Sequence, residues 1–265
     1  MVEKDSLFQH FRRDEKLFLE KIEELIQKVE DSYYIQVTEF LDPRQVYIAK
    51  ILLTTRKTIF YVSSDYYAME YARIIISPPS PYYEFDFSDF GISLLNISYN
   101  DKFNQLTHAQ ILGTLLHTLG IKRTVIGDII IKKGQAQLLL DSKMVSYFKN
   151  NIHKIGRTSV ILSEDSLDHL IQTDDSDETV DILTTSLRVD KVISSVLKIS
   201  RNEALALITS DKVKINYMIV NKAFYTISAT DIISVRGYGR FIIASDNGLS
   251  KQKKHKLTII RKVHK

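Results

Sequence analysis

In the last third of the chain, the spacing of hydrophobic residues changes from that of a helix to the alternation of a strand. Apolar residues recur at helical spacing after Ser186, and Ser200 with Glu203 forms the signature of a capping box before a second apolar run. Short alternating segments follow over residues 213–216, 232–236 and 241–243, and Gly237 and Gly239 favour a tight hairpin turn. This order predicts two helices packed on a small sheet.

The middle third predicts the order strand, helix, strand, strand, helix, strand. Thr107 and Asp141 are expected caps of the two helices, Gly120 ends the first helix, and Lys133-Gly134 marks a hairpin. The strands are expected over residues 91–99, 129–131, 137–140 and 159–162. This is the order of the ferredoxin-like (RRM-like) plait, whose open sheet face often binds RNA, an inference made by analogy only.

The first third predicts a mixed helical and stranded region. An amphipathic helix is expected over Phe8–Val29, a turn at Asp42-Pro43, and strands over 57–63 and 73–77. Three of the four prolines lie in residues 77–81, and an acidic run covers residues 173–178. We therefore expect an α+β protein with three parts: residues 1–77, the plait over 82–172, and the module over 182–265.

Charge is strongly polarised along the chain. From Ser186 onward 16 Lys and Arg face 5 Asp and Glu, a net +11, whereas the whole chain is +4 and residues 1–185 therefore carry −7. A basic region on an otherwise acidic chain indicates a polyanionic partner for that end only. If RNA phosphates are that partner, affinity falls steeply with salt.

Candidate RNA-binding residues follow from this charge and from the expected elements. Along the first helix of the module, the spacing of its basic residues places them on a common polar face, although a merely solvated face fits equally well. The primary candidates are Arg188, Lys191, Lys198, Arg201, Lys212, Lys214, Arg236 and Arg240. A second set lies mostly at the ends of plait elements: Arg123, Lys132, Lys133, Lys154 and Arg157.

The module resembles the S-four domain, an RNA-binding family named after a small-subunit ribosomal protein. The residues that carry the resemblance are Arg188-Val189-Asp190-Lys191, Ser200 to Ala204, Val213 to Asn216 and Asp231 to Val235. The family usually has glycine where this chain has Asp211, Tyr217 and Thr230. These three departures concern turns rather than the helix pair.

Over nearly its full length the chain resembles the bacterial YlmH family. Besides the module, the resemblance rests on Phe40 to Pro43, Leu119 to Arg123 with Ile126 to Ile129, and Lys154 to Arg157. It departs at Ser64 to Tyr66, where the family has a glycine pair. The resemblance implies a factor that binds ribosomal RNA and tRNA on large subunits carrying peptidyl-tRNA, with a quality-control protein partner, and that assists tailing of the stalled chain.

The residues offer little support for catalysis, a cofactor or a metal. No phosphate-cradling loop is present, the seven histidines show no paired metal spacing, and Glu164, Asp165 and Asp168 resemble a helix N-terminus. The absence of cysteine, of a signal peptide and of a membrane-length apolar stretch fits a cytoplasmic protein, and we expect a monomer. Two alternatives stay open: an RNA-modifying enzyme of pseudouridine synthase type, and an RNA-tethered scaffold linked to cell division.

Overall fold

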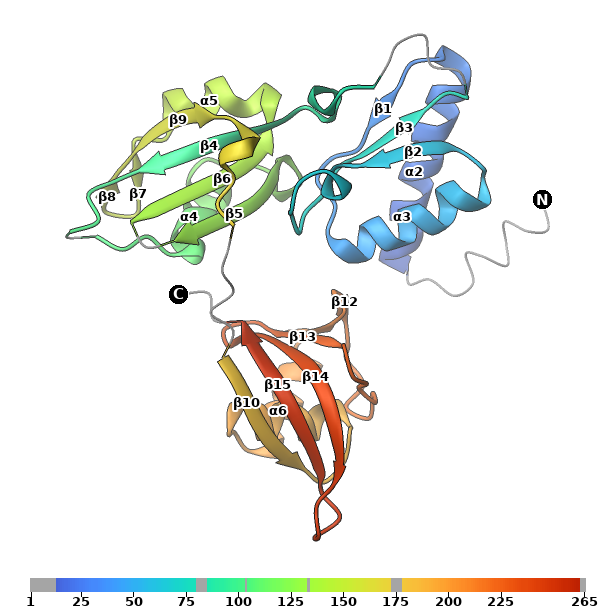
Figure 1. Ribbon diagram of the computed structural model, residues 1–265, viewed down its shortest axis with the longest axis vertical. Coiled ribbons are helices and arrows are strands. Elements are labelled where there is room, and N and C mark those ends of the chain that lie inside the picture. The colour runs from blue at the N-terminus through green and yellow to red at the C-terminus, as the bar shows by residue number, and fades with distance from the viewer. Residues whose placement is uncertain (1–12, 80–84, 103, 133, 173–177, 263–265) are drawn as a thin grey trace. The chain divides into compact units, whose positions relative to one another are not determined.

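The protein forms two compact units, Met1–Thr173 (unit 1) and Asp174–Lys265 (unit 2) (Figure 1). The structure, a computed structural model, describes residues 13–79, 85–102, 104–132, 134–172 and 178–262. The part of the predicted first helix before residue 13 lies outside these ranges. Unit 2 begins within the acidic run that the sequence marks as a boundary.

The first part of unit 1 packs two helices on a three-stranded antiparallel sheet in the order β1-β3-β2. Buried Leu19, Ile22, Ile26 and Val29 form the inner stripe of the first helix. The last three belong to the apolar side that the periodicity predicts, whereas Leu17, expected on that side, is exposed. The elements are α2 (Arg13–Ser32), β1 (Gln36–Val37), α3 (Pro43–Thr55), β2 (Ile59–Val62), a 3-10 turn (Ser63–Asp65) and β3 (Ile74–Ser77).

Helix α3 corrects the turn predicted at Asp42-Pro43. Asp42 accepts a hydrogen bond from the Gln45 backbone N–H at 2.9 Å, and the Gln45 side chain accepts from the Asp42 N–H at 3.0 Å. Pro43 is the first residue of the helix, where its missing N–H costs nothing and its fixed φ fits. The Asp-Pro pair therefore starts a helix that the sequence reading missed.

The rest of unit 1 is the predicted ferredoxin-like plait, with an antiparallel sheet in the order β5-β6-β4-β9. Thr107 and Asp141 act as the predicted caps, and Gly120 ends the first helix with a φ of +64°. The elements are β4 (Ile92–Ser98), α4 (His108–Gly113) with a π-helical turn (Thr114–Thr118), β5 (Ile126–Lys132), β6 (Gln135–Asp141), α5 (Val145–Asn151) and β9 (Ile161–Asp165), with 3-10 turns at Phe87–Phe90, Arg123–Val125, Ser142–Met144 and Leu167–His169. A small hairpin, β7 (Lys154–Ile155) with β8 (Thr158–Ser159), was not predicted.

Both faces of the plait sheet are covered, which contradicts the expectation of an open RNA-binding face. On one face, Leu95, Leu138 and Leu140 share a core with Ile111 and Phe148 of the helices. The other face, with Ile92, Leu94, Ile130 and Leu139, is buried against Phe40, Ile75, Phe90 and Leu170. Base stacking on this sheet, as in an RRM, would require these side chains to leave a shared core.

Polar contacts of Arg73 and Asp128 tie the first part of unit 1 to the plait. The buried Arg73 donates from Nε to the Thr38 carbonyl at 2.7 Å and from Nη1 to the Gly91 carbonyl at 2.9 Å. Asp128 accepts from the backbone N–H groups of Glu70 and Tyr71 at 2.6 and 2.9 Å. The expected boundary near residues 77–82 therefore lies inside one compact unit, and independent folding of the two regions stays a prediction.

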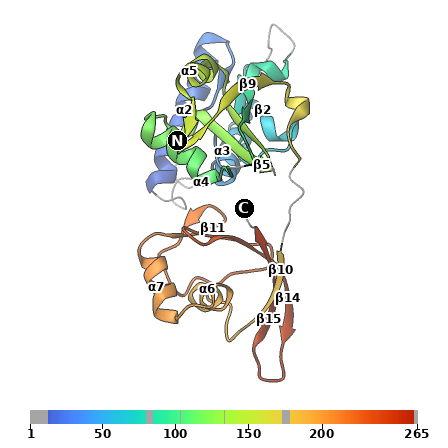
Figure 2. The ribbon, with the colours of Figure 1, turned by 90° about the vertical axis from the view of Figure 1, so that its left-hand side faces the viewer.

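Unit 2 places two helices on one side of a six-stranded sheet in the order β10-β15-β14-β13-β11-β12 (Figure 2). The elements are β10 (Glu178–Thr184), α6 (Val189–Leu197), α7 (Arg201–Thr209), β11 (Val213–Ile215), β12 (Met218–Ile219), β13 (Ile232–Val235), β14 (Gly239–Leu249) and β15 (His255–Lys262). The capping box of Ser200 and Glu203 and the hairpin turn at Gly237 are as predicted. Strand β10 was missed, although Val180 and Ile182 alternate with polar residues, because it directly follows the acidic run of the expected linker.

The three turns where this chain lacks the family glycines keep a left-handed backbone. Asp211, Tyr217 and Thr230 have φ values of 55°, 67° and 73°. Their backbones still make the turn contacts, and the Thr230 N–H donates to the Ile243 carbonyl at 2.7 Å. The fold of the module is thus retained with side chains in a conformation that disfavours them.

Candidate RNA-binding surface

A fully buried carboxylate joins the starts of the two helices of unit 2. Asp190, in the first turn of α6, accepts from Arg188 at both oxygens, with Nε–Oδ1 and Nη2–Oδ2 distances of 3.0 Å. Arg201, the first residue of α7, donates from Nε to Oδ2 at 3.0 Å. One carboxylate therefore orients two guanidinium groups from different helices.

Burial and the two arginines act on Asp190 in opposite directions. Desolvation raises the pKa of its carboxyl, but the hydrogen bonds and charges of Arg188 and Arg201 outweigh burial and hold the pKa below its usual value. Asp190 is therefore ionised at neutral pH and carries one negative charge between two positive ones. The three groups together keep a net charge of +1 at this point.

The two arginines remain accessible although they contact a buried group. The Arg188 and Arg201 side chains are 39% and 50% exposed. Planar guanidinium groups bind phosphate through several N–H donors, and a fixed orientation reduces the entropy lost on binding. The arrangement is suited to holding phosphates.

The other two candidates on the helix pair lie along α6. Lys191 follows Arg188 by three residues, in the first turn of α6, and is partly exposed. Lys198 ends α6 with a φ of 55° and is exposed. We call Arg188, Lys191, Lys198 and Arg201 the helix-pair surface.

The remaining four primary candidates belong to the sheet rather than to the helices. Lys214 and Arg240 are both aligned with Ser234, and Arg240 is also aligned with Lys262. Their strand neighbours Val213, Ile215 and Phe241 are buried towards the helices, so this row points from the opposite face of the sheet. Arg236 donates its backbone N–H to the Lys212 carbonyl, which places this exposed pair at the strand ends. The eight predicted residues therefore form more than one surface.

The structure also separates the second set of candidates. Lys132, Lys154 and Arg157 are exposed at one end of the plait, where Asp101 lies against Gly134 and Asn104 accepts a hydrogen bond from Thr158 at 3.1 Å. Arg123 precedes the opposite end of β5, and its guanidinium lies 3.9 Å from the centre of the Tyr71 ring. Arg123 thus has a packing role, and Lys133 lies outside the described residues.

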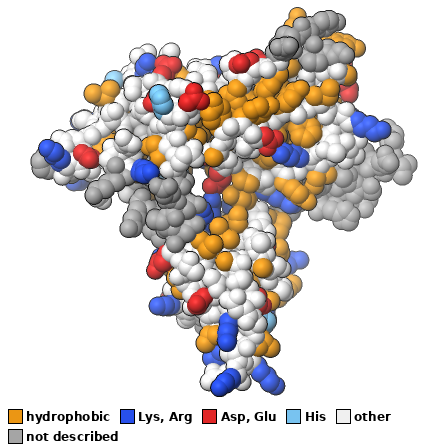
Figure 3. All heavy atoms as spheres, in the orientation of Figure 1, with side chains coloured by type: hydrophobic (Ala, Val, Ile, Leu, Met, Phe, Trp, Pro, Cys, Tyr) orange, Lys and Arg blue, Asp and Glu red, His pale blue; other side chains and the backbone are white. Residues whose placement is uncertain are grey.

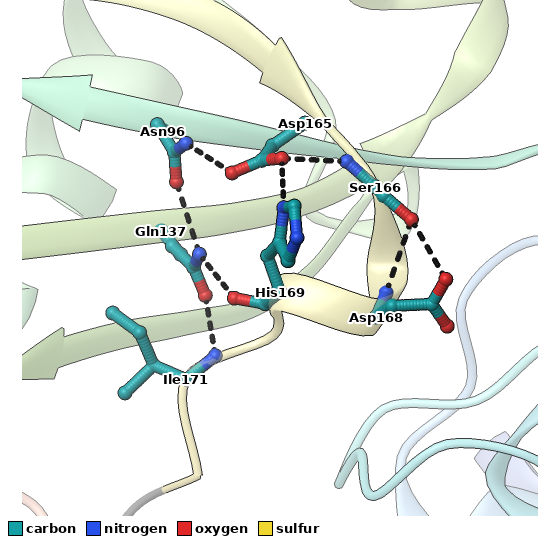
Figure 4. A network of polar contacts seen from close by, with 7 residues as sticks. All are labelled: Asn96, Gln137, Asp165, Ser166, Asp168, His169 and Ile171. Atoms are coloured by element: carbon teal, nitrogen blue, oxygen red, sulfur yellow. Dashed lines mark hydrogen bonds and ion pairs between the residues drawn. The ribbon is translucent and has the colours of Figure 1, made fainter.

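The sequence predicted a helix N-terminus at Glu164, Asp165 and Asp168, which is wrong for the first two. Glu164 and Asp165 lie in strand β9, and only Asp168 lies in a short 3-10 turn. Asp165 accepts from Asn96 and from His169 Nδ1, both at 2.6 Å, and Gln137 binds the backbone of His169 and Ile171 (Figure 4). The hydrogen bond and charge of Asp165 raise the pKa of His169, and the same hydrogen bond lowers the pKa of Asp165. This network fixes residues 166–171 across the sheet.

Within the described parts of the chain, no three His, Asp or Glu side chains gather to hold a metal ion. Asp190, in the only Arg-Val-Asp string, is fully buried and occupied by two arginines, so a nucleobase could not reach it as the pseudouridine synthase alternative requires. None of the described helices has the length and hydropathy needed to cross a bilayer.

Sequence reasoning found the arginines but missed the carboxylate that organises them. Asp190 lies among the buried Val189, Val192 and Ile193. Its position within this apolar run was the signal that could have identified it as a buried carboxylate. A charged residue inside an apolar stripe is almost always paired, and Arg188 and Arg201 were the neighbouring cations.

Comparisons with known proteins agree with this architecture. Residues 86–169 match a family model described as "Putative RNA-binding domain in YlmH". The chain is 30% identical over 260 residues to ribosome-associated protein quality control protein P2 of Bacillus subtilis, which covers 97% of this chain and 98% of the relative. It also resembles the solved cell division protein ylmH from Streptococcus pneumoniae, with a TM-score of 0.55 and 39% identity over 62% of this chain and 98% of that one. The chain therefore belongs to the YlmH family.

Proposed function

We propose that this protein binds RNA on large ribosomal subunits that carry an obstructed peptidyl-tRNA and assists tailing of the nascent chain in quality control. The name of the Bacillus subtilis relative, which aligns over nearly the whole chain, supports a ribosome-associated role. The structural observation that carries the proposal is the pair of accessible arginines held by Asp190. The protein would act in the cytoplasm, as a monomer, with a quality-control protein as its partner.

The proposed mechanism is positioning without bond chemistry. The helix-pair surface would hold phosphates of ribosomal RNA or tRNA and so favour one position of the tRNA. The exposed residues Lys132, Lys154 and Arg157 would add a second phosphate contact from the loop end of the plait. Because its sheet face is buried, the plait would bind RNA through these loops rather than by base stacking.

The test is binding of the full-length protein to large subunits with and without peptidyl-tRNA, at two salt concentrations. A variant with Lys191→Gln and Arg201→Gln removes two cations but leaves the bidentate Arg188–Asp190 pair intact. The control, Lys21→Gln with Lys28→Gln, removes two exposed cations from α2.

We expect the wild type to prefer the particle with peptidyl-tRNA, and the first variant to lose roughly 1.4–1.8 from the slope of log affinity against log salt. Equal losses in both variants would show that the helix-pair surface is not the contact. Equal binding to both particles would reduce the role to general RNA binding.

A further inference from the structure

The β14–β15 hairpin of unit 2 extends beyond the neighbouring strand β13. Strand β14 has 11 residues and β15 has 8, whereas β13 has 4. The turn between the long strands lies at one end of unit 2 (Figure 1). In the same orientation, this end of the unit shows blue Lys and Arg side chains (Figure 3).

The turn has a defined conformation. The Ser250 N–H donates to the Lys254 carbonyl at 2.7 Å, and the Lys253 N–H donates to the Ser250 carbonyl at 2.8 Å. The Ser250 hydroxyl also accepts from the Lys254 N–H at 3.1 Å, and Lys253 has a left-handed φ of 58°. A fixed backbone lets the side chains of this turn keep their spacing.

The turn is rich in lysine and poor in acids. We call the segment that contains Lys251, Lys253, Lys254 and Lys256 the lysine turn; Lys251, Lys253 and Lys256 are exposed and Lys254 is partly exposed. The nearest acid on the hairpin, Asp246, lies with Oδ2 3.1 Å from Nδ1 of His255, and no Asp or Glu follows Asp246 in the sequence. Leu249, beside the turn, is 58% exposed.

The helix-pair surface begins near the base of the lysine turn. His255 is aligned with Thr184 at the end of β10, and Arg188 follows Thr184 by four residues. A chain of four residues spans at most about 14 Å. This segment is further compacted, because the Thr184 hydroxyl donates to the Ser186 carbonyl and the Ser186 hydroxyl accepts from the Arg188 N–H.

We infer that the lysine turn is a second site for RNA phosphates, which contacts the same RNA that the helix-pair surface binds. This inference rests on the proposed RNA-binding function and assigns a further part of its surface. Flexible lysines at a fixed turn act as point charges along a phosphate backbone, without reading sequence. Two contacts from one rigid unit would orient the RNA as well as hold it.

The experiment uses full-length protein and purified large ribosomal subunits over a range of salt concentrations. The turn variant carries Lys251→Gln, Lys253→Asn and Lys256→Gln, because asparagine tolerates the left-handed conformation of residue 253. Its charge-matched control carries Lys21→Gln, Lys28→Gln and Lys143→Gln, three exposed lysines of unit 1. Thermal unfolding of both variants checks that the fold is kept.

We expect the turn variant to lower the slope of log affinity against log salt by about 2, at roughly 0.7–0.9 per phosphate contact, and the control to leave it unchanged. A turn variant that matches its control, while Lys191→Gln with Arg201→Gln still weakens binding, would overturn this inference alone. If the helix-pair variant also binds like wild type, the proposed function falls with it.

Discussion

Asp190 and Arg201, eleven residues apart, are joined at 3.0 Å across the starts of two helices, and Arg188 shares the same carboxylate. The acid is fully buried, whereas the arginines are accessible. A negative charge at the centre of a basic surface would ordinarily oppose RNA binding. Here it orients the cations that we propose bind RNA.

This relationship predicts that Asp190→Asn weakens RNA binding although it makes the surface more positive. The amide turns an N–H group towards a guanidinium, so one hydrogen bond is lost and the arginines lose their fixed orientation. We expect a loss of about 1–3 kcal/mol in the free energy of unfolding. Urea unfolding and salt-dependent binding to large subunits measure the two effects.

Glu203→Gln is the matched control, because it removes a neighbouring carboxylate while glutamine can still complete the capping box with Ser200. We expect a small loss of stability, because the charged Glu203 favours the start of the helix, and equal or tighter binding. If Asp190→Asn also binds more tightly, net charge governs the surface and the orienting role of Asp190 is wrong.

The left-handed turns predict a stabilising substitution. Thr230 has a φ of 73°, which costs a non-glycine residue roughly 1–2 kcal/mol, and β-branching makes this position more strained. Thr230→Gly relieves this cost, but glycine raises the conformational entropy of the unfolded chain, which lowers the free energy of unfolding by about 0.4–1 kcal/mol. We expect a net stabilisation of about 0.5–1 kcal/mol, visible as a higher Tm. Thr226→Gly, at a residue outside the left-handed region, should lower the Tm.

We expect substitution by alanine to have opposite effects on stability at Gly127 and at Gly113. A Cβ at Gly127 would lie 2.7 Å from Phe40 Cε1 and 2.9 Å from Leu139 Cβ, within the buried core. Gly127→Ala should therefore destabilise unit 1 by about 1–3 kcal/mol. Gly113 ends α4 and a Cβ there meets nothing within 4 Å, so Gly113→Ala should stabilise by about 0.5–1 kcal/mol. Urea unfolding measures the free energy of unfolding of both variants. Equal changes in this free energy would show that Phe40 does not pack closely on β5.

The Asp165–His169 pair predicts a shifted histidine titration. The Asp165 hydrogen bond and charge raise the pKa of His169, so the proton is held to higher pH than in the unfolded chain. The raised pKa of His169 therefore stabilises the fold fully below about pH 6.5, as long as Asp165 is ionised, and this contribution is lost as pH rises through the folded-state pKa of His169. It is also lost in acid, as pH falls through the lowered pKa of Asp165. In an NMR titration, Asp165→Asn should lower the pKa of His169. Glu164→Gln, which removes an exposed neighbouring acid bound to Lys149, should leave that pKa unchanged.

Local signals in the sequence predicted much of this fold because they act over few residues. The side chains of Ser200, Thr107 and Asp141 cap their helices as expected, since capping depends only on the next three residues. The plait followed from the order of such elements. Pro43 was misread because proline favours both turns and the first residue of a helix.

The long-range relationships could not be predicted in the same way. The burial of Ile92 and Leu139 under Phe40 and Leu170 depends on residues far apart in the chain. The place of β10 at the edge of the sheet depends on its pairing with β15, more than 70 residues further along the chain. The role of Asp190 likewise requires the position of Arg201 on another helix.

The pairing of the last strand with β10 has a consequence for synthesis. Strand β15 lies between β10 and β14, so these two strands have no partner on that side until residues 255–262 are made. A copy of the protein cut short before residue 255 would expose two unpaired strand edges, which promote aggregation. Synthesis of residues 255–262 is thus a condition for unit 2 to reach its native sheet.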